Sequence, residues 1–446
     1  MANKIDRPVS RRTVLKGLAG GTAALATSEL VGGLGPMLAR AASSSHSSEI
    51  VIGYVSPETG SLASFATPDD FVLKRIRETS AFSKGLTKGK KKYSIKIIEV
   101  DSQSDPTRAS QVTKNLILQD KVDLIVTSSA PETVNPVAGV CESEHVPCVS
   151  TVCPWESWYY AGLGATPPGT SQKFAYNTLF FFGIREFGKC FVPMWNRIHK
   201  KYSTDKVIAC MFPNDADGNA FRMGFPPVIS AAGYTEIDGG AYPDGQTGYT
   251  SMISQFKDGN ADFYLNCPLP PDFNTMWKQA HEQGFKPKLA TVAKVLLFPS
   301  DTTALGSLVE NIATDAWWTP YSPYRSSLTG ESAKQLAAAF ESASGQQWTQ
   351  SIGSTYTLFE IAHQALARAS DPHDKREVAA QLHSLKMQSI CGHLDFTSGP
   401  APGVAIIEPV GVQWKKGTKY PFSMYVVDNS ANKDVPINGK LEPTRA

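Results

Sequence analysis

Hydroxyl side chains cluster where a predicted strand runs into a helix. The apolar run 122–127 is followed by Ser128-Ser129-Ala130-Pro131-Glu132-Thr133, with proline at the first helical position. Hydroxyl groups and free backbone N–H groups at a helix N-terminus form a site for an anion. We interpret Ser129, Ala130 and Thr133 as candidate ligand-binding residues; the alternative is that Ser129 or a neighbour only caps the helix.

Aromatic side chains follow the next predicted strand, 146–150. The segment Ser150-Thr151-Val152-Cys153-Pro154-Trp155 leads into Trp158, Tyr159 and Tyr160. Aromatic residues after a loop often belong to the core, and that alternative stands here. Trp155 is the best candidate among them for stacking on an apolar or aromatic ligand.

No catalytic motif accompanies these loops. The sequence contains no GxSxG, no HExxH, no P-loop and no GxGxxG after a strand. The eight histidines are dispersed, and His363 lies beside an apolar helical stripe that is typical of a core position. The loop 214–218 hints at a calcium loop, but its glycine comes one residue too early and no glutamate completes it. We therefore expect no catalytic residue, no cofactor and no metal.

Strand and helix patterns alternate along the chain and must position these loops. Apolar, β-branched runs at 49–55, 93–100 and 122–127 are separated by helical patterns, one of which opens at Asp105-Pro106. The same alternation of strand and helix patterns begins again after Phe180. It predicts an α/β protein with two lobes, each built on a mostly parallel sheet wrapped by helices.

The first forty residues indicate export. Ser10-Arg11-Arg12-Thr13-Val14-Leu15-Lys16 is a twin-arginine signature, an apolar stretch follows to about Leu38, and Ala39-Arg40-Ala41 is a signal-peptidase pattern. We predict a twin-arginine signal peptide at 1–41 and a mature chain that folds before export to the periplasm. A basic, disordered N-terminus is the alternative.

Net charge and cysteine spacing limit the kinds of partner, metal site and disulfide that the chain can have. The chain has 446 residues and a net charge of +2, but 1–41 carries six basic and two acidic side chains, so the mature chain is near −2. That balance excludes a nucleic-acid partner, which needs a clustered positive field. The seven cysteines match no zinc pattern. Cys141 and Cys148 are spaced for a bridge from a helix end to a strand, and at least one cysteine must stay a free thiol.

Several segments together resemble a known family in order and spacing. They are IGYVSPETGSLASF, VDSQSDPTRASQVTKNLILQDKVDLIVTSSAPET, HVPCVSTVCPW and KVIACMFPNDADG. Each is weak alone, but their collinearity resembles the periplasmic solute-binding proteins of ABC importers, of the branched-chain amino-acid (leucine/isoleucine/valine) binding type.

The resemblance implies the type I periplasmic binding protein fold, in which two doubly wound α/β lobes are joined by three crossover strands. Laid on this sequence, the crossings fall near 179–185, 314–320 and 389–396. Lobe 1 then contains 49–182 plus 320–390, and lobe 2 contains 183–319 plus 391–446.

The resemblance also implies roles for individual residues. The 128–133 loop would grip a ligand carboxylate, and Ser150 and Thr151 would supply hydroxyl and backbone contacts. Phe65 matches an aromatic lid position of the family. The loop with Asp215 and Asp217 would face the ligand from lobe 2.

One departure from the family concerns the ligand. Amino-acid-binding members carry an acidic residue near Ala290–Val295 to hold the ligand ammonium, but this stretch contains Lys294 and no acid. A buried cation would repel an ammonium and favour an anion. The sequence therefore favours a carboxylate or aromatic acid over an amino acid or amide, unless Lys294 faces solvent.

The resemblance implies a protein that captures a small solute and hands it to an ABC permease in the inner membrane. Such a component is no enzyme and is expected to be a monomer. Two alternatives remain: a cofactor-containing periplasmic enzyme exported folded, and a ligand-sensing partner of a membrane receptor.

Overall fold

The computed structural model of the chain describes residues 48–162, 169–170 and 174–445. The predicted twin-arginine signal peptide lies outside the described residues. Among the helices that are described, none is both long and apolar enough to cross a membrane.

The first lobe is built on a seven-stranded sheet with the order β14-β6-β5-β4-β1-β3-β2. All its pairings are parallel except the one between β2 and β3. Its strands are β1 (Glu49–Ser56), β2 (Leu86–Lys88), β3 (Lys91–Asp101), β4 (Leu124–Ser128), β5 (Cys148–Thr151), β6 (Asn177–Phe180) and β14 (Val404–Ala405). Its helices are η1 (Ala63–Ala66), α1 (Asp69–Glu78), α2 (Ser80–Ser83), α3 (Pro106–Leu118), α4 (Pro131–Ser143), η2 (Ser157–Gly162), α10 (Ala333–Ser344), α11 (Ser351–Arg368) and α12 (Lys375–His383).

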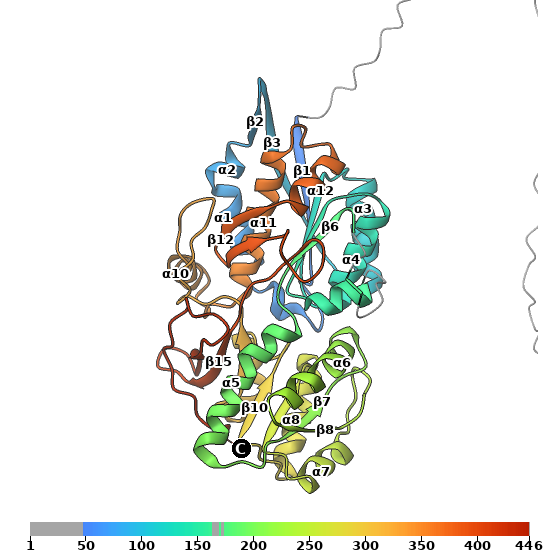
Figure 1. The fold of residues 1–446 in the computed structure, drawn as a ribbon. Coiled ribbons are helices and arrows are strands. Elements are labelled where there is room, and N and C mark those ends of the chain that lie inside the picture. The colour runs from blue at the N-terminus through green and yellow to red at the C-terminus, as the bar shows by residue number, and fades with distance from the viewer. Residues whose placement is uncertain (1–47, 163–168, 171–173, 446) are drawn as a thin grey trace, which may run out of the picture. The chain divides into compact units, whose positions relative to one another are not determined.

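Strand β1 shows why helices cover both faces of this sheet. Ile50, Ile52 and Tyr54 belong to the core shared with α1 and α11, whereas Val51 and Val55 pack with α3 and α4. A central parallel strand is apolar on both sides because neither side meets water. Figure 1 shows α3 and α4 on one side of the sheet and α11 on the other.

The second lobe repeats the plan with the strand order β16-β15-β11-β10-β9-β7-β8. Its strands are β7 (Val207–Met211), β8 (Thr235–Asp238), β9 (Phe263–Asn266), β10 (Leu289–Val292), β11 (Ala313–Ala316), β15 (Val410–Lys416) and β16 (Phe422–Asp428). Its helices are α5 (Ile184–Tyr202), α6 (Ala216–Ala231), α7 (Thr250–Asp258), α8 (Pro270–Glu282), α9 (Pro299–Leu305) and η3 (Gly306–Val309). The side chains of α5 and α6 share one core with this sheet, and those of α7 and α8 share another.

The chain passes between the sheets three times. The first two passages follow β6 and β11, near the expected positions 179–185 and 314–320. The third lies between Ala405 and Val410 rather than near 389–396, because β14 pairs with β6 and β15 pairs with β11. A two-residue strand in a segment rich in proline and glycine has no alternating pattern, so the sequence did not place it in the first sheet.

The predicted fold class, two doubly wound α/β lobes, is confirmed. Asp105 caps α3 as predicted, since its carboxylate accepts a hydrogen bond from the N–H of Arg108 at 2.6 Å. Asp374 caps α12 by accepting hydrogen bonds from the N–H groups of Arg376 and Glu377. All seven cysteines are buried free thiols, so Cys141 and Cys148 form no bridge.

Candidate functional site

A small cavity lies where the carboxyl ends of strands from both sheets face each other. Crevices at this edge of parallel sheets are where α/β proteins bind ligands. Its walls come from both lobes and from two of the passages between them. The lining residues are Phe65, Ala130, Val152, Pro154, Phe181, Phe187, Asp217, Phe221, Cys267, Ala293, Lys294, Leu297, Asp315 and Trp317.

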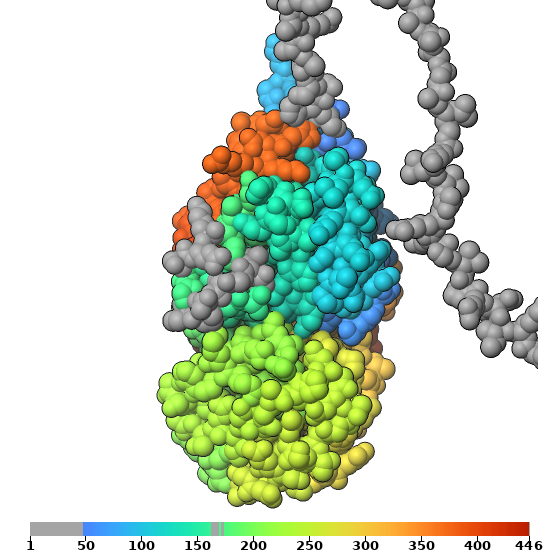
Figure 2. Space-filling view, turned by 90° about the vertical axis from the view of Figure 1, so that its right-hand side faces the viewer, coloured from blue at the N-terminus to red at the C-terminus, as the bar shows by residue number. Residues whose placement is uncertain are grey.

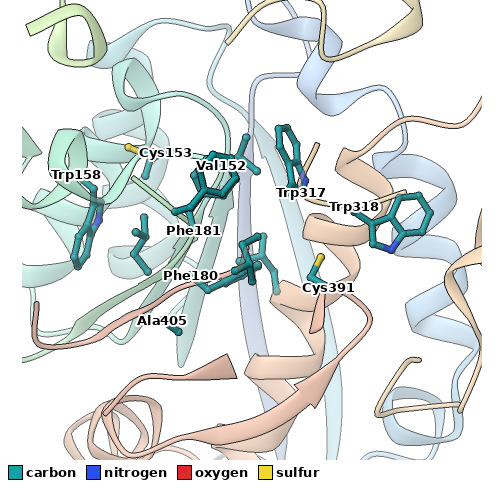
Figure 3. Packing of buried hydrophobic residues seen from close by; sticks show 14 of the residues in the cluster. Val152, Cys153, Trp158, Phe180, Phe181, Trp317, Trp318, Cys391 and Ala405 are labelled. Carbon is teal, nitrogen blue, oxygen red and sulfur yellow. The ribbon is translucent and has the colours of Figure 1, made fainter. Parts of the chain in front are cut away.

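Five aromatic side chains contribute to the apolar wall. The rings of Phe181 and Trp317 meet edge to face with centroids 5.3 Å apart, and those of Phe187 and Phe221 are 5.0 Å apart. Figure 3 shows Val152, Phe181 and Trp317 arriving from separate segments of the chain. A wall of this kind favours a ligand with an apolar or aromatic body.

Lys294 is buried among carboxylates at the edge of the cavity. Its Nζ lies 2.6 Å from Oε1 of Glu132, 2.9 Å from Oδ2 of Asp215 and 3.1 Å from Oδ2 of Asp217, and 5% of its side chain is exposed. Burial lowers the pKa of Lys294, but the carboxylates outweigh it and hold the pKa well above its ordinary value. The solvent-facing alternative for Lys294 is therefore wrong.

Three carboxyl groups surround the positive charge of Lys294. Burial raises the pKa of Asp217 to about 7, against the lowering effect of Lys294. Burial also raises the pKa of Asp215, but Lys294 and the backbone N–H of Gly218 leave it below its ordinary value. The premise of an unmatched cation in the cleft is wrong, because acids from distant segments surround the ammonium.

Two of the acids around Lys294 also belong to a group of three carboxylates, among the described residues, that is close enough together to hold a metal ion. Carboxylate oxygens of Glu132, Asp215 and Asp244 lie within 4.8 Å of one another. The ammonium of Lys294 already lies against Glu132 and Asp215. The cluster is therefore an ion-pair network in this structure, and we assign no metal to it.

The first turn of α4 holds hydroxyls without partners. The N-cap is Ala130 and no side chain caps the helix, so the capping alternative for Ser129 is wrong. The hydroxyls of Ser128, Ser129 and Thr133 are buried without a hydrogen-bond partner within the described part of the chain. Ala130 lines the cavity, and the three hydroxyls lie directly around it in the chain. A buried hydroxyl without a partner is a group that a ligand can satisfy.

Six of the predicted ligand-binding residues lie outside the cavity lining: Ser129, Thr133, Ser150, Thr151, Trp155 and Asp215. The hydroxyl of Thr151 donates to the carbonyl of Phe180 at 2.7 Å, and that of Ser150 lies 3.8 Å from Sγ of Cys148. The ring of Trp155 packs against Tyr160, with centroids 5.7 Å apart. Ligand contacts for these residues stay predictions.

The two lobes touch around the cavity. The rings of Phe65 and Phe298 are 4.7 Å apart, and the hydroxyl of Ser157 donates to Oδ1 of Asp217 at 2.8 Å. On the face shown in Figure 2, atoms of the blue-green first lobe meet atoms of the green and yellow second lobe. Both lobes therefore contribute contacts beside the cavity.

Sequence reasoning missed several lining residues. Phe187 and Phe221 lie on helices, where an aromatic residue has no signal that separates a cavity wall from a core. Asp315 and Trp317 lie at the end of β11, in the segment expected to be a crossing. The sequence offered one signal for them, because residues at the carboxyl end of a parallel strand are candidates for a ligand site.

Comparison with known proteins identifies a family and a shared fold. The family model described as periplasmic binding protein matches residues 49–417. The leucine-binding protein LivK of Thermotoga maritima is 16% identical with a TM-score of 0.68, covering 84% of this chain and 97% of that one. LivJ of Streptococcus pneumoniae, solved with isoleucine, is 15% identical with a TM-score of 0.65, covering 85% and 99%. A solute-binding protein of a Rhodopseudomonas palustris ABC transporter, solved with 4-hydroxybenzoate, is 16% identical with a TM-score of 0.66, covering 89% and 98%.

Proposed function

Since the chain belongs to the periplasmic binding protein family, we propose that it is the periplasmic substrate-binding component of an ABC importer. Its similarity to structures of such components, LivJ and the Rhodopseudomonas palustris protein among them, supports this role. On this proposal it performs no reaction on its ligand, works as a monomer, and delivers the ligand to a permease in the inner membrane. The twin-arginine pattern at 10–16 supports export in the folded state.

The ligand that fits best is a small carboxylic acid with an apolar or aromatic body. The observation that carries this is the aromatic-lined cavity beside the uncapped first turn of α4. A carboxylate at that turn would accept hydrogen bonds from Ser129 and Thr133 and would face the positive end of the helix dipole. Phe65, Phe187 and Phe221 would cover the apolar body.

Capture follows from the position of the cavity between the lobes. The ligand docks on the first lobe, through the loops after β4 and β5, and the second lobe then closes over it. Asp217 and Lys294 complete the wall when the lobes close. The ligand stabilises the closed state only by contacts that the open state lacks.

A thermal-shift screen tests the proposal directly. The panel contains benzoate, 4-hydroxybenzoate, 3,4-dihydroxybenzoate, leucine and isoleucine. A specific ligand at about 100 times its dissociation constant adds about 2.7 kcal/mol to the free energy of unfolding. The control is Ala130→Leu, which adds volume to the cavity wall and should abolish the shift. Equal shifts in both proteins, or no shift with any compound, would contradict the proposal.

A further inference from the structure

Two polar groups in the cavity wall have no partner. Asp315 is 2% exposed and its Oδ1 accepts no hydrogen bond; Trp317 is 4% exposed and its Nε1–H donates none, within the part of the chain that the structure describes. Both side chains line the cavity. Asp315 lies in β11 and Trp317 directly follows the strand, so both side chains reach the cavity from one short segment of the chain.

The backbone of this segment is held in place independently of its side chains. Nε2 of Gln350 donates to the carbonyl of Asp315 at 3.2 Å, and Oε1 of Gln350 accepts from the N–H of Trp317 at 3.0 Å. The ring of Trp317 also packs against Phe181. Gln350 therefore holds the backbone that carries both side chains, while Oδ1 of Asp315 and Nε1–H of Trp317 stay without a partner among the described residues.

Buried indole N–H groups elsewhere in the chain are of two kinds. The indole N–H of Trp277 donates to the carbonyl of Leu308 at 3.0 Å, and that of Trp414 donates to the carbonyl of Leu296 at 2.7 Å. The indoles of Trp158 and Trp318 have no partner among the described residues, but neither lines the cavity. Leaving a buried donor or acceptor unpaired costs free energy, so an unpaired acceptor and donor in one cavity point to a ligand.

The two free groups are one acceptor and one donor, which is the complement of a hydroxyl. An ammonium would bring three donors to one free acceptor oxygen and leave the others unpaired among aromatic rings. A ligand carboxylate would bring a second acid against Asp315. Burial raises the pKa of Asp315 to about 7, and its acceptor capacity survives in either protonation state.

We propose that Asp315 and Trp317 form a hydroxyl-binding subsite, in which a ligand hydroxyl donates to Oδ1 of Asp315 and accepts from Nε1–H of Trp317. This inference rests on the proposed function and deepens it. The ligand is then a hydroxylated aromatic or apolar carboxylic acid. Its hydroxyl binds at the end of β11.

Matched pairs of probes test the subsite by isothermal titration calorimetry. Benzoate is compared with 4-hydroxybenzoate, and phenylalanine with tyrosine. In the wild type, we expect the hydroxylated member of the bound pair to bind at least tenfold tighter. Asp315→Ala and Trp317→Phe should remove that advantage, measured as the ratio of the two affinities within each pair, whereas Asp315→Asn, which keeps an acceptor oxygen, should retain part of it. Equal affinity within each pair, or an advantage that survives both substitutions, overturns the proposal.

A ligand-free measurement decides the question if no probe binds. Asp315→Leu should raise the midpoint of thermal unfolding at pH 8, because it removes a buried carboxyl group whose Oδ1 has no partner among the described residues. The control is Glu360→Gln, since Glu360 is equally buried but accepts from the N–H groups of Ser327 and Ile390 at 2.6 and 2.9 Å. That variant should lower the midpoint.

The two measurements separate the subsite from the proposed function. If no probe binds and Asp315→Leu still raises the midpoint, the ligand class proposed above fails and the unpaired subsite stands. If Asp315→Leu lowers the midpoint as much as Glu360→Gln does, Asp315 is a structural residue and the subsite is overturned.

Discussion

The ammonium of Lys294 lies 2.6 Å from a carboxylate oxygen of Glu132, so an ion pair joins a loop of the second lobe to the first turn of α4 in the first lobe. The same ammonium is held by Asp215 and Asp217 of its own lobe. Closing the lobes therefore brings Glu132 to a cation that already has two partners. This ion pair is a contact that the closed state makes and an open state would lose.

Replacing Lys294 by methionine should destabilise the protein strongly. The variant keeps the length of the side chain but leaves three carboxylates around an uncharged group, and breaking a buried ion pair in this way costs about 3–5 kcal/mol. Urea unfolding of the ligand-free protein measures the loss. The control is Lys419→Gln, which breaks the exposed pair with Glu341 and should leave the free energy of unfolding almost unchanged. Similar losses in both variants would show that the network is not stabilising.

Asp69 should make stability fall as pH rises. Burial raises the pKa of Asp69 from 3.8 to about 8, although hydrogen bonds from Ser56 and Tyr54 lower it. The folded protein therefore retains a proton that the unfolded chain releases above about pH 4, and the stability linked to it is lost between about pH 4 and pH 8.

Asp69→Asn removes this titration, so the stability of the variant relative to the wild type should rise between pH 5 and pH 9. Urea midpoints at the two pH values measure the change. Asp395→Asn is the control, since hydrogen bonds from Thr397 lower the pKa of Asp395 and place its titration below this window. A relative stability of Asp69→Asn that is the same at both pH values would contradict the assignment.

Phe65→Ala should weaken ligand binding by about 10- to 100-fold. The ring lines the cavity and meets Phe298 of the second lobe, so truncation removes both ligand cover and a contact of the closed state. Losing a buried aromatic contact of this size costs about 1.5–3 kcal/mol. Calorimetric titration with the ligand from the screen measures the effect. Phe71→Ala, which removes a ring packed on Phe340 away from the cavity lining, should leave the affinity unchanged.

Thr133→Val separates a ligand-binding hydroxyl from a structural one. The hydroxyl of Thr133 has no partner, so its loss should leave the ligand-free protein as stable as the wild type or up to about 1 kcal/mol more stable. Affinity for a carboxylate ligand should fall about tenfold, the loss of one hydrogen bond to a charged group.

The matched control is Thr127→Val. The hydroxyl of Thr127 donates to the carbonyl of Val55 at 2.9 Å, so this variant should lose about 1 kcal/mol of stability and keep its affinity. If Thr133→Val behaves in the same way as Thr127→Val, Thr133 has no role in the ligand site.

All seven cysteines should be detected as thiols. In guanidinium chloride without reductant, a colorimetric thiol titration should count seven, because no pair is bridged. In the native protein the reaction should be slow, since every thiol is buried and burial raises the pKa of groups such as Cys153 and Cys190. A count of five in the unfolded protein would reveal one disulfide.

The sequence by itself determined the local elements and their order. Asp105-Pro106 begins α3 because a carboxylate cap and a proline act on their immediate neighbours. The alternation of apolar strands and amphipathic helices predicted two α/β lobes, and the hydroxyl-rich loop after the strand at 122–127 predicted Ala130, which lines the cavity. Asp217 and Lys294, which also line it, were expected from the family resemblance. These signals are carried by residues close together in the chain.

Only the tertiary structure decided what surrounds each side chain. Lys294 was predicted as an unmatched cation because no acid lies near it in sequence, yet Glu132 is 162 positions away and Asp215 is 79. The sequence likewise does not show that Gln350 holds the backbone of Asp315 and Trp317, because that contact joins segments far apart in the chain. Charge compensation and hydrogen-bond satisfaction act over a few ångströms of space, and the fold alone sets which distant segments come that close.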